Sequence, residues 1–397
     1  MHDVEVFRVR LGLIQAFLRK NQYDGILLSR VDNFAMATGG KRNYVNIAGE
    51  EGGCSLFVDA DANACYVGNN IEKSRVITEE LAGITDEIRE FLWFEDSDGE
   101  AAKRHFGGNI VSDTGAAGPN VNADLAYLRS LLTEAELEKY RRLGALGAEA
   151  MTATIQAIEA DQAEADIAAT LTAEAAKRRC LLPVCLIAAD DRIASYRHPL
   201  PTYGDLLGGG SQEHKVRNYV MVVGCFQREG LIVSMTRFKR VGELPASISD
   251  AFERICGVDA MMQEATVPGK TLGDVFAACQ AAYKDLGFPE NEWHNHHQGG
   301  PTGYSARTAK GAPGSTFPIA DPAWPELLRE HAGMDAPLGQ AYAWNPSAVG
   351  VKSEDTFILL PDGTKEIVTG TPELPAVDVS KVLGRRLDIP KSGIAGP

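Results

Sequence analysis

The chain has 397 residues, of which 44% are hydrophobic and 23% charged, a composition typical of a globular protein with a large core. Its 39 Lys and Arg residues against 54 Asp and Glu residues give a formal net charge of −15, which disfavours nucleic acid or an anionic membrane surface as a partner. It has neither an 18-residue apolar run nor a signal-peptide pattern, and its seven cysteines include no C-x-x-C pair. We therefore expect a cytoplasmic protein without a structural zinc site.

The first third of the chain predicts a compact α/β unit, which we place at residues 1–130. The predicted elements are a helix over 5–20, a strand over 23–29, strands over 55–58 and 64–67 that form a hairpin, helices over 75–81 and 84–92, and a strand over 109–112. This region contains no phosphate-loop or dinucleotide-binding fingerprint.

A second, larger domain is predicted over residues 131–385. It begins with a helix, because Thr133 followed three residues later by Glu136 is a capping box. The sequence predicts that helical structure continues to residue 158 and resumes over 164–178. The elements predicted after it are a hairpin of strands 218–226 and 231–238, helices over 248–262 and 271–286, and strands over 342–346 and 354–360. Residues 386–397 are predicted to be a loose tail.

The stretch Trp293–Gly300, WHNHHQGG, is the most unusual local feature of the chain. It contains three of the eight histidines, followed by two glycines that allow a ligand to come close to the backbone. Such a cluster is typical of a functional site, although a surface loop is the alternative. Of the adjacent residues His296 and His297, we expect one ring to face the site and the other to face away.

Five motifs occur in an order that resembles the pita-bread family of creatinases, prolidases, aminopeptidases P and methionine aminopeptidases. They are the helix from Thr133 to Arg141, the segment His198–Thr202, the hairpin end Ser234–Arg237, the His-Gly-Gly stretch, and Trp344–Pro346 followed by Lys352–Thr356. The resemblance covers nearly the whole chain. It implies a smaller N-terminal α/β domain followed by a C-terminal pita-bread domain, that is, an α/β (α+β) fold, and a homodimer.

The resemblance also implies a site for two metal ions, held in the peptidases of the family by two Asp, one His and two Glu. The matching positions in this chain are Val223, Ser234, His297, Asn345 and Glu354. Three carboxylates are therefore lost, and a dinuclear divalent site needs carboxylates to bridge and neutralise its cations. We predict a site with no metal and no other cofactor.

The remaining residues resemble creatinase, the branch that cleaves a C–N bond without metal. The resemblance makes His198 the proton shuttle, and Arg307 the group that grips a substrate carboxylate. Creatinase has glutamates that hold the guanidinium where this chain has Thr236 and Asn345. The exchange favours a less cationic substrate, such as an amide, an imide or a cyclic amidine.

The predicted catalytic residues are His198, His297 and Glu354. The predicted substrate-binding residues are Arg307, Asn345, His296, Thr236, Ser234, Tyr304 and Trp344. Each has a structural alternative: His198 as a loop residue that caps a strand, Arg307 as the partner of an acidic neighbour, Asn345 as a satisfied turn residue, and the two aromatic residues as plain core. Cys225 fits a small buried hydrophobe better than a nucleophile.

These residues predict a metal-independent hydrolase, or a lyase, that cleaves a C–N bond of a small carboxylate-bearing amide, cyclic amidine or guanidino compound. Two alternatives stay open. One is a metal-dependent Xaa-Pro dipeptidase or aminopeptidase with atypical ligands, and the other is a catalytically silent peptide-binding module.

Overall fold

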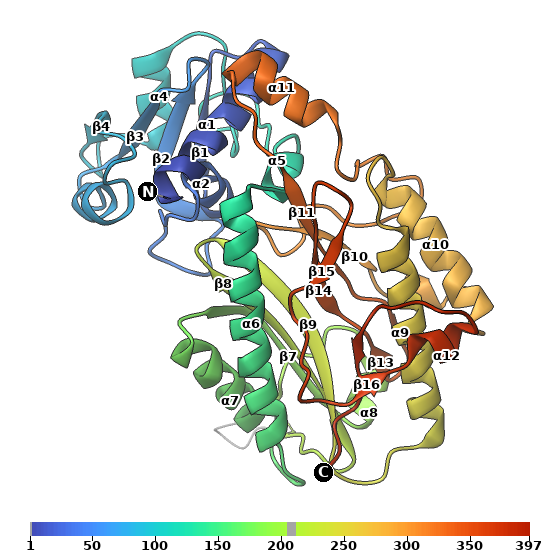
Figure 1. Ribbon diagram of the computed structural model, residues 1–397. Helices are drawn as coiled ribbons and strands as arrows, with labels where there is room; N and C mark the ends of the chain where they lie inside the picture. The colour runs from blue at the N-terminus through green and yellow to red at the C-terminus, as the bar shows by residue number, and fades with distance from the viewer. Residues whose placement is uncertain (1, 205–211) are drawn as a thin grey trace.

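A computed structural model describes residues 2–204 and 212–397 of the chain, and the N-terminal domain is an α/β unit around one mixed sheet. The sheet has the strand order β4-β3-β2-β1-β5 (Figure 1). Its elements are α1 (His2–Asn21), β1 (Gly25–Arg30), α2 (Val31–Thr38), β2 (Glu51–Asp59), β3 (Ala64–Asn69), α3 (Lys73–Arg75), the π-helical turn η1 (Val76–Glu80), β4 (Ile88–Phe91), α4 (Asp98–Phe106), β5 (Ile110–Ser112) and α5 (Ala126–Ser130).

The helix predicted over 84–92 is wrong. Residues 88–91 form β4 instead, which pairs in parallel with β3 from Tyr66 to Asn69. The apolar residues of 84–92 have the spacing of a short helix, but β3 offers this segment backbone hydrogen-bond partners. The pairing with β3 therefore outweighs the local pattern. The other predicted elements of this domain are present.

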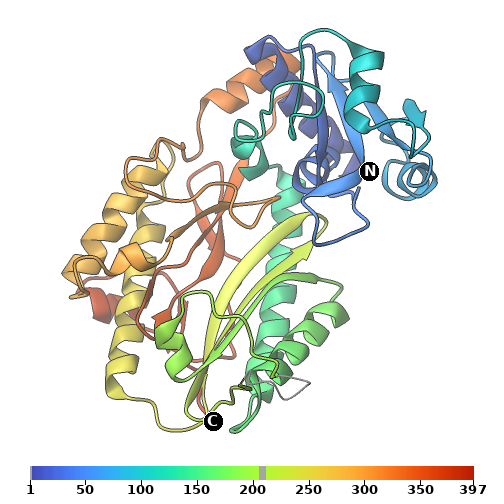
Figure 2. The same cartoon turned by 180° about the vertical axis from the view of Figure 1, so that it is seen from behind.

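The C-terminal domain contains two main sheets, with strand orders β7-β8-β9 and β10-β11-β14-β15, and β6 pairs with β11. Its elements are β6 (Leu131–Leu132), α6 (Glu134–Ala157), α7 (Glu164–Lys177), β7 (Leu181–Ala189), α8 (Asp191–Ser195), β8 (Tyr219–Arg228), β9 (Leu231–Arg240), α9 (Ala246–Ala265), α10 (Leu272–Asp285), the 3₁₀ turn η2 (Glu292–Asn295), β10 (Gly299–Thr302), α11 (Ala323–Ala332), β11 (Gly339–Trp344), β12 (Ser347–Ala348), β13 (Val351–Lys352), β14 (Asp355–Leu359), β15 (Lys365–Ile367), β16 (Ala376–Val377), α12 (Val379–Leu383) and β17 (Lys391–Ser392). The strands lie between the helices α6 and α7 on one side and α9 and α10 on the other, as both views show (Figures 1 and 2).

Local sequence explains how the central elements begin. The predicted capping box of α6 is present, since Thr133 accepts from the backbone of Glu136 and the Glu136 carboxylate accepts from the backbone of Thr133. The predicted hairpin is β8 and β9, whose register pairs Cys225 with Ser234. Both strands are buried for most of their length, as their mainly apolar residues predict.

The prediction of a loose tail is wrong for its last residues. Lys391, on β17, is buried and forms an ion pair with Asp259 on α9. The Ala395 N–H donates to the Phe238 carbonyl, and the Arg240 N–H donates to the Ala395 carbonyl, at 3.0 and 2.8 Å. The tail is docked because a buried acid on α9 and the end of β9 provide partners for it, which composition alone does not reveal.

A buried polar cluster joins the two domains. Arg10 of α1 donates through Nε to the Glu136 carboxylate at 2.8 Å, and its guanidinium lies 4.9 Å from the ring centroid of Tyr304. The Tyr304 hydroxyl donates to the same carboxylate. The prediction that Tyr304 lines a substrate pocket is therefore corrected: its hydroxyl is committed to the domain junction.

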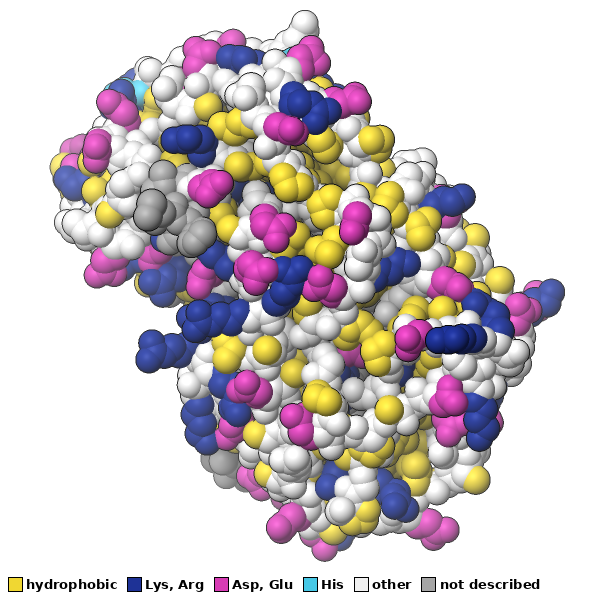
Figure 3. All heavy atoms as spheres, in the orientation of Figure 1, with side chains coloured by type: hydrophobic (Ala, Val, Ile, Leu, Met, Phe, Trp, Pro, Cys, Tyr) yellow, Lys and Arg dark blue, Asp and Glu magenta, His cyan; other side chains and the backbone are white. Residues whose placement is uncertain are grey.

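Basic and acidic side chains are interspersed over the face of the molecule shown in Figure 3. None of the described helices is both long enough and apolar enough to span a membrane.

Candidate functional site

The candidate site is a small cavity of about 120 Å³ in the C-terminal domain. It is lined by Val184, Leu186, His198, Val223, Cys225, His297, Ala306, Arg307, Asn345, Lys352 and Glu354. These residues come from β7, β8, the loop after α8, the segments on both sides of β10, and the turns around β13. Segments far apart in the chain thus meet at one point, as the five motifs imply.

An arginine lies where the resemblance places the metal ligands of the family's peptidases. Of the five matching positions, Val223, His297, Asn345 and Glu354 line the cavity, and Ser234 lies beside it. The Arg307 guanidinium donates from Nη1 to Ser234 Oγ at 3.1 Å and from Nη2 to Glu354 Oε1 at 2.5 Å. One fixed positive charge therefore bridges two of the five positions, and it neutralises the one carboxylate that remains among them.

Glu354 has partners at both carboxylate oxygens. Thr236 Oγ1 donates to its Oε2 at 2.7 Å, and Asn345 Nδ2 lies 3.4 Å from its Oε1. Oε1 also receives the Arg307 contact, so the charge of this buried acid is compensated. Thr236 and Ser234 support Glu354 and Arg307 and do not line the cavity themselves.

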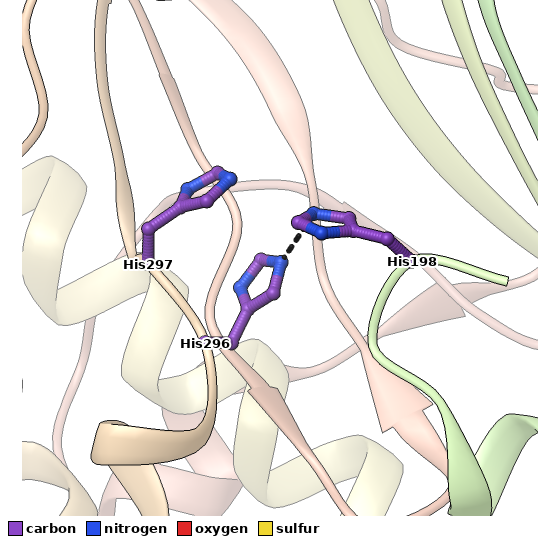
Figure 4. A group of neighbouring side chains, drawn as sticks. All are labelled: His198, His296 and His297. Carbon is purple, nitrogen blue, oxygen red and sulfur yellow. Dashed lines mark hydrogen bonds between the residues drawn. The ribbon is translucent and has the colours of Figure 1, made fainter.

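Three histidine rings, from the loop after α8 and from the segment before β10, point toward one another (Figure 4). Ring nitrogens of His198, His296 and His297 all lie within 4.8 Å of one another, and His198 Nε2 is 2.9 Å from His296 Nε2. His198 is held in the loop between α8 and β8, where Pro199 and Pro201 restrict the backbone. His297 lines the cavity, whereas His296 lies behind it and is 8% exposed. Of the two adjacent histidines, one ring therefore lines the cavity and the other does not, although both rings lie close to His198.

The backbone fixes the tautomer of His297. The Gly299 N–H donates to His297 Nδ1 at 3.3 Å, so the lone pair lies on Nδ1 and the proton of the neutral ring on Nε2. Gly299 has a φ of +90°, and a Cβ there would lie 2.2 Å from the Ala343 carbonyl oxygen, so only glycine allows this approach. Burial, and then the charge of Arg307, lowers the pKa of His297 to about 3.

These donors do not fit the dinuclear metal group that the resemblance implies. A metal ligand at His297 Nε2 would need a proton on Nδ1, which here faces a backbone donor. Arg307 and Lys352 also line the cavity, and both charges lower the pKa of His297. The positive charges at this cavity are therefore the side chains of Arg307 and Lys352, which disfavour the binding of further cations.

Lys352 is the second cation at the cavity, and its side chain is buried. Nζ donates to the Arg197 carbonyl at 3.0 Å and lies 3.5 Å from His296 Nε2. Burial lowers the pKa of Lys352 to about 8, and the charge of Glu354 opposes that shift. Burial of the rings, followed by the charge of Lys352, lowers the pKa values of His296 and His198. Together with His297, all three rings therefore favour the neutral form.

Eight of the ten predicted site residues lie at the cavity, in two groups. His198, His297, Glu354, Arg307 and Asn345 line the cavity, and His296, Ser234 and Thr236 lie directly behind it.

Trp344 lies elsewhere, in the core, so its predicted place in the pocket is corrected. Its Nε1 donates to Thr266 Oγ1 at 2.9 Å. Lys352 was not predicted as a site residue, although its position two residues before Glu354 on an extended segment would place both side chains on one face.

Cys225 lines the cavity wall, but burial raises the pKa of its thiol to about 11. It hydrogen-bonds Ser234 at 3.2 Å, consistent with a small buried side chain and not with an activated nucleophile.

No protein-family model matches the chain, and no curated protein matches it by sequence. Solved structures do match it over nearly its whole length. A dipeptidase from Pyrococcus horikoshii OT3 is 14% identical, with a TM-score of 0.67, covering 91% of this chain and 98% of its own.

Two further structures show the range of proteins with this architecture. An Xaa-Pro dipeptidase from Bacillus anthracis is 14% identical, with a TM-score of 0.65 and coverage of 97% and 99%. The N-terminal domain of the FACT complex subunit SPT16 from chickpea is 10% identical, with a TM-score of 0.63 and coverage of 96% and 99%. The chain therefore has the two-domain pita-bread fold of the prolidases and Xaa-Pro dipeptidases, with a smaller N-terminal α/β domain before the pita-bread domain.

Proposed function

We propose that this protein is a metal-independent hydrolase that cleaves a C–N bond of a small carboxylate-bearing amide, cyclic amidine or guanidino compound. One observation carries the proposal: the Arg307 guanidinium joins Ser234 to Glu354 where the fold's carboxylate ligands would meet, beside neutral histidines. The site thus combines a fixed positive charge with imidazoles suited to proton transfer.

His198 is the proton carrier in this proposal. A neutral imidazole accepts a proton from water as the oxygen attacks the carbon of the scissile C–N bond, and His198 then returns this proton to the departing nitrogen. The water supplies OH to the carbon and H to the nitrogen, so the step balances. His296, 2.9 Å away through the Nε2 atoms, positions the His198 ring.

The substrate is held by polar atoms of known orientation. His297 Nε2–H, fixed by the backbone of Gly299, is a donor for a carbonyl oxygen or for the negative charge that develops on it. Asn345 Oδ1 is buried without a protein partner and can accept from a substrate N–H. A neutral acceptor at this place suits an amide better than a cationic group.

The experiment is a turnover screen of small amides, cyclic amidines, guanidino acids and dipeptides, followed by His198→Ala with the substrate found. We expect kcat/KM to fall by about 10²–10⁴. His294→Ala is the matched control, because His294 is an exposed histidine outside the cluster, and its kcat/KM should be unchanged. Full activity of His198→Ala would contradict the proposal.

A second candidate is a metal-dependent Xaa-Pro dipeptidase with atypical ligands. It is favoured by the fold of the dipeptidase structures and by three histidines whose nitrogens lie within 4.8 Å. Elemental analysis of the purified protein separates the two candidates. Two stoichiometric Mn, Co or Zn ions per chain, with activity lost on chelation, would establish the second. Ligand binding without any turnover in the screen would instead favour a silent binding module.

A further inference from the structure

Two cations line the cavity, the buried Lys352 and the partly buried Arg307, and they differ in how their charge is compensated. Arg307 forms an ion pair with Glu354 and donates to Ser234 and to its neighbour's carbonyl, that of Ala306. Its Nε has no hydrogen-bond partner among the described residues. Most N–H donors of the guanidinium are therefore already engaged within the protein. Few of them are left to bind a substrate carboxylate, which is the role that the resemblance gives to Arg307.

Lys352 forms no such ion pair with any residue that the structure describes, although the charge of Glu354 acts on it from a distance. Its side chain is 2% exposed, and its ammonium contacts one backbone carbonyl and one imidazole nitrogen. Within the described residues it forms no ion pair with a carboxylate. Glu354, two residues away, has both oxygens engaged by Arg307, Thr236 and Asn345. An ammonium has three N–H donors, so one of them has no acceptor among the residues that the structure describes.

A buried charge that has polar contacts but no ion-pair partner is costly, and an anion in the same cavity reduces that cost. The cavity of about 120 Å³ admits only a small molecule, and Lys352 forms part of its wall. His297 and Asn345 line the same cavity, and the Nε2–H of one and the Oδ1 of the other suit an amide. One compact ligand with a carboxylate and an amide group satisfies all three.

We propose that Lys352, and not Arg307, binds the carboxylate of the substrate and selects anionic over neutral ligands. The identity of the substrate class rests on the proposed function, whereas the preference for a carboxylate rests on the cavity itself. Arg307 then has a different role: it holds Glu354 and replaces the charge of the cations bound in other members of the fold.

The experiment compares two matched probes, N-acetylglycine and its uncharged amide N-acetylglycinamide, by isothermal titration calorimetry on the full-length protein. We expect the wild-type protein to bind the carboxylate at least tenfold more tightly than the amide. Lys352→Met should reduce this ratio to about one, and Lys352→Arg should retain a preference for the carboxylate. Lys310→Met is the control, because Lys310 is an exposed cation close enough to lower the pKa of His297, and it should keep the preference.

The proposal is overturned if wild-type protein does not distinguish the two probes, or if Lys352→Met keeps the preference while its circular dichroism spectrum is native. Failure of the hydrolase proposal looks different. In that case the carboxylate preference depends on Lys352, but no compound of the screen is turned over. His198→Ala connects the two, since it should abolish turnover and leave the preference for N-acetylglycine intact.

Discussion

Two buried lysines, Lys352 and Lys391, lie on either side of the strand segment that carries Glu354 and Asp355, and their surroundings are opposite. Both side chains are about 2% exposed. Lys391 Nζ lies 2.5 Å from Asp259 Oδ2 and 3.9 Å from Asp355 Oδ2. In the part of the chain that the structure describes, the Lys352 ammonium contacts a backbone carbonyl and an imidazole.

The contrast separates a structural cation from one that is open to a ligand. The Lys391 cluster is closed: Asp259 also accepts from Ser353, and Asp355 accepts from Arg237 at 2.7 Å, so every charge has a partner. The Lys352 environment is open, because its side chain forms part of the cavity wall. A buried charge that is fully paired stabilises the folded structure, whereas a buried charge without an ion-pair partner beside a cavity indicates a ligand-binding site.

The largest effect is expected from Lys391→Met. The change leaves Asp259 buried without its cation and releases the docked tail, so the free energy of unfolding should fall by about 3–5 kcal/mol. Urea denaturation of the full-length protein measures it. A loss smaller than about 1 kcal/mol would remove the distinction between the two lysines.

Glu354→Gln tests the compensated pair inside the cavity. Arg307 loses its counter-charge, but it borders the cavity and water reaches it, so the expected loss of stability is about 1–3 kcal/mol. Denaturant unfolding should place this variant between Lys391→Met and the wild-type protein. A loss as large as that of Lys391→Met would mean that the cavity is closed to water.

Asp98, in the N-terminal domain, is a partly buried acid and extends the comparison to a carboxyl group that has no ion pair among the described residues. Burial raises its pKa to about 6 from an ordinary value of 3.8, and Ser55 donates to it. Because the folded-state pKa is the higher one, its contribution to stability is present below about pH 4 and is lost as the pH rises through 6.

Asp98→Asn should therefore stabilise the protein at pH 7 by about 1–2 kcal/mol and flatten the dependence of stability on pH between 4 and 6. Thermal unfolding across that range is the measurement. An unchanged pH profile would show that this carboxyl group is solvated.

The smallest effect on stability is expected from Lys352→Met. Since the lysine has no carboxylate partner to leave behind, the unfolding free energy should change by less than about 1 kcal/mol, or rise. The sign is the informative result, because the same substitution at position 391 is strongly destabilising. Parallel urea titrations of the two variants compare them directly.

The sequence by itself determined the order of the elements, the capping box of α6 and the hairpin of β8 and β9, because these depend on neighbouring residues. It also determined which carboxylates are absent, since positions 223, 234 and 345 are read directly from the chain. Local patterns failed at β4 and at the tail, where the partners lie on other elements.

Only the tertiary structure decided how the remaining charges are paired. Ser234, Arg307 and Glu354 are separated by 73 and 47 residues, yet the guanidinium of one joins the side chains of the other two. The partners of a buried charge are set by packing across the fold, so no spacing in the chain reveals that Arg307 is committed and that Lys352 is not. Likewise, the ring orientation of His297 follows from its contact with the backbone of Gly299 and not from residue type.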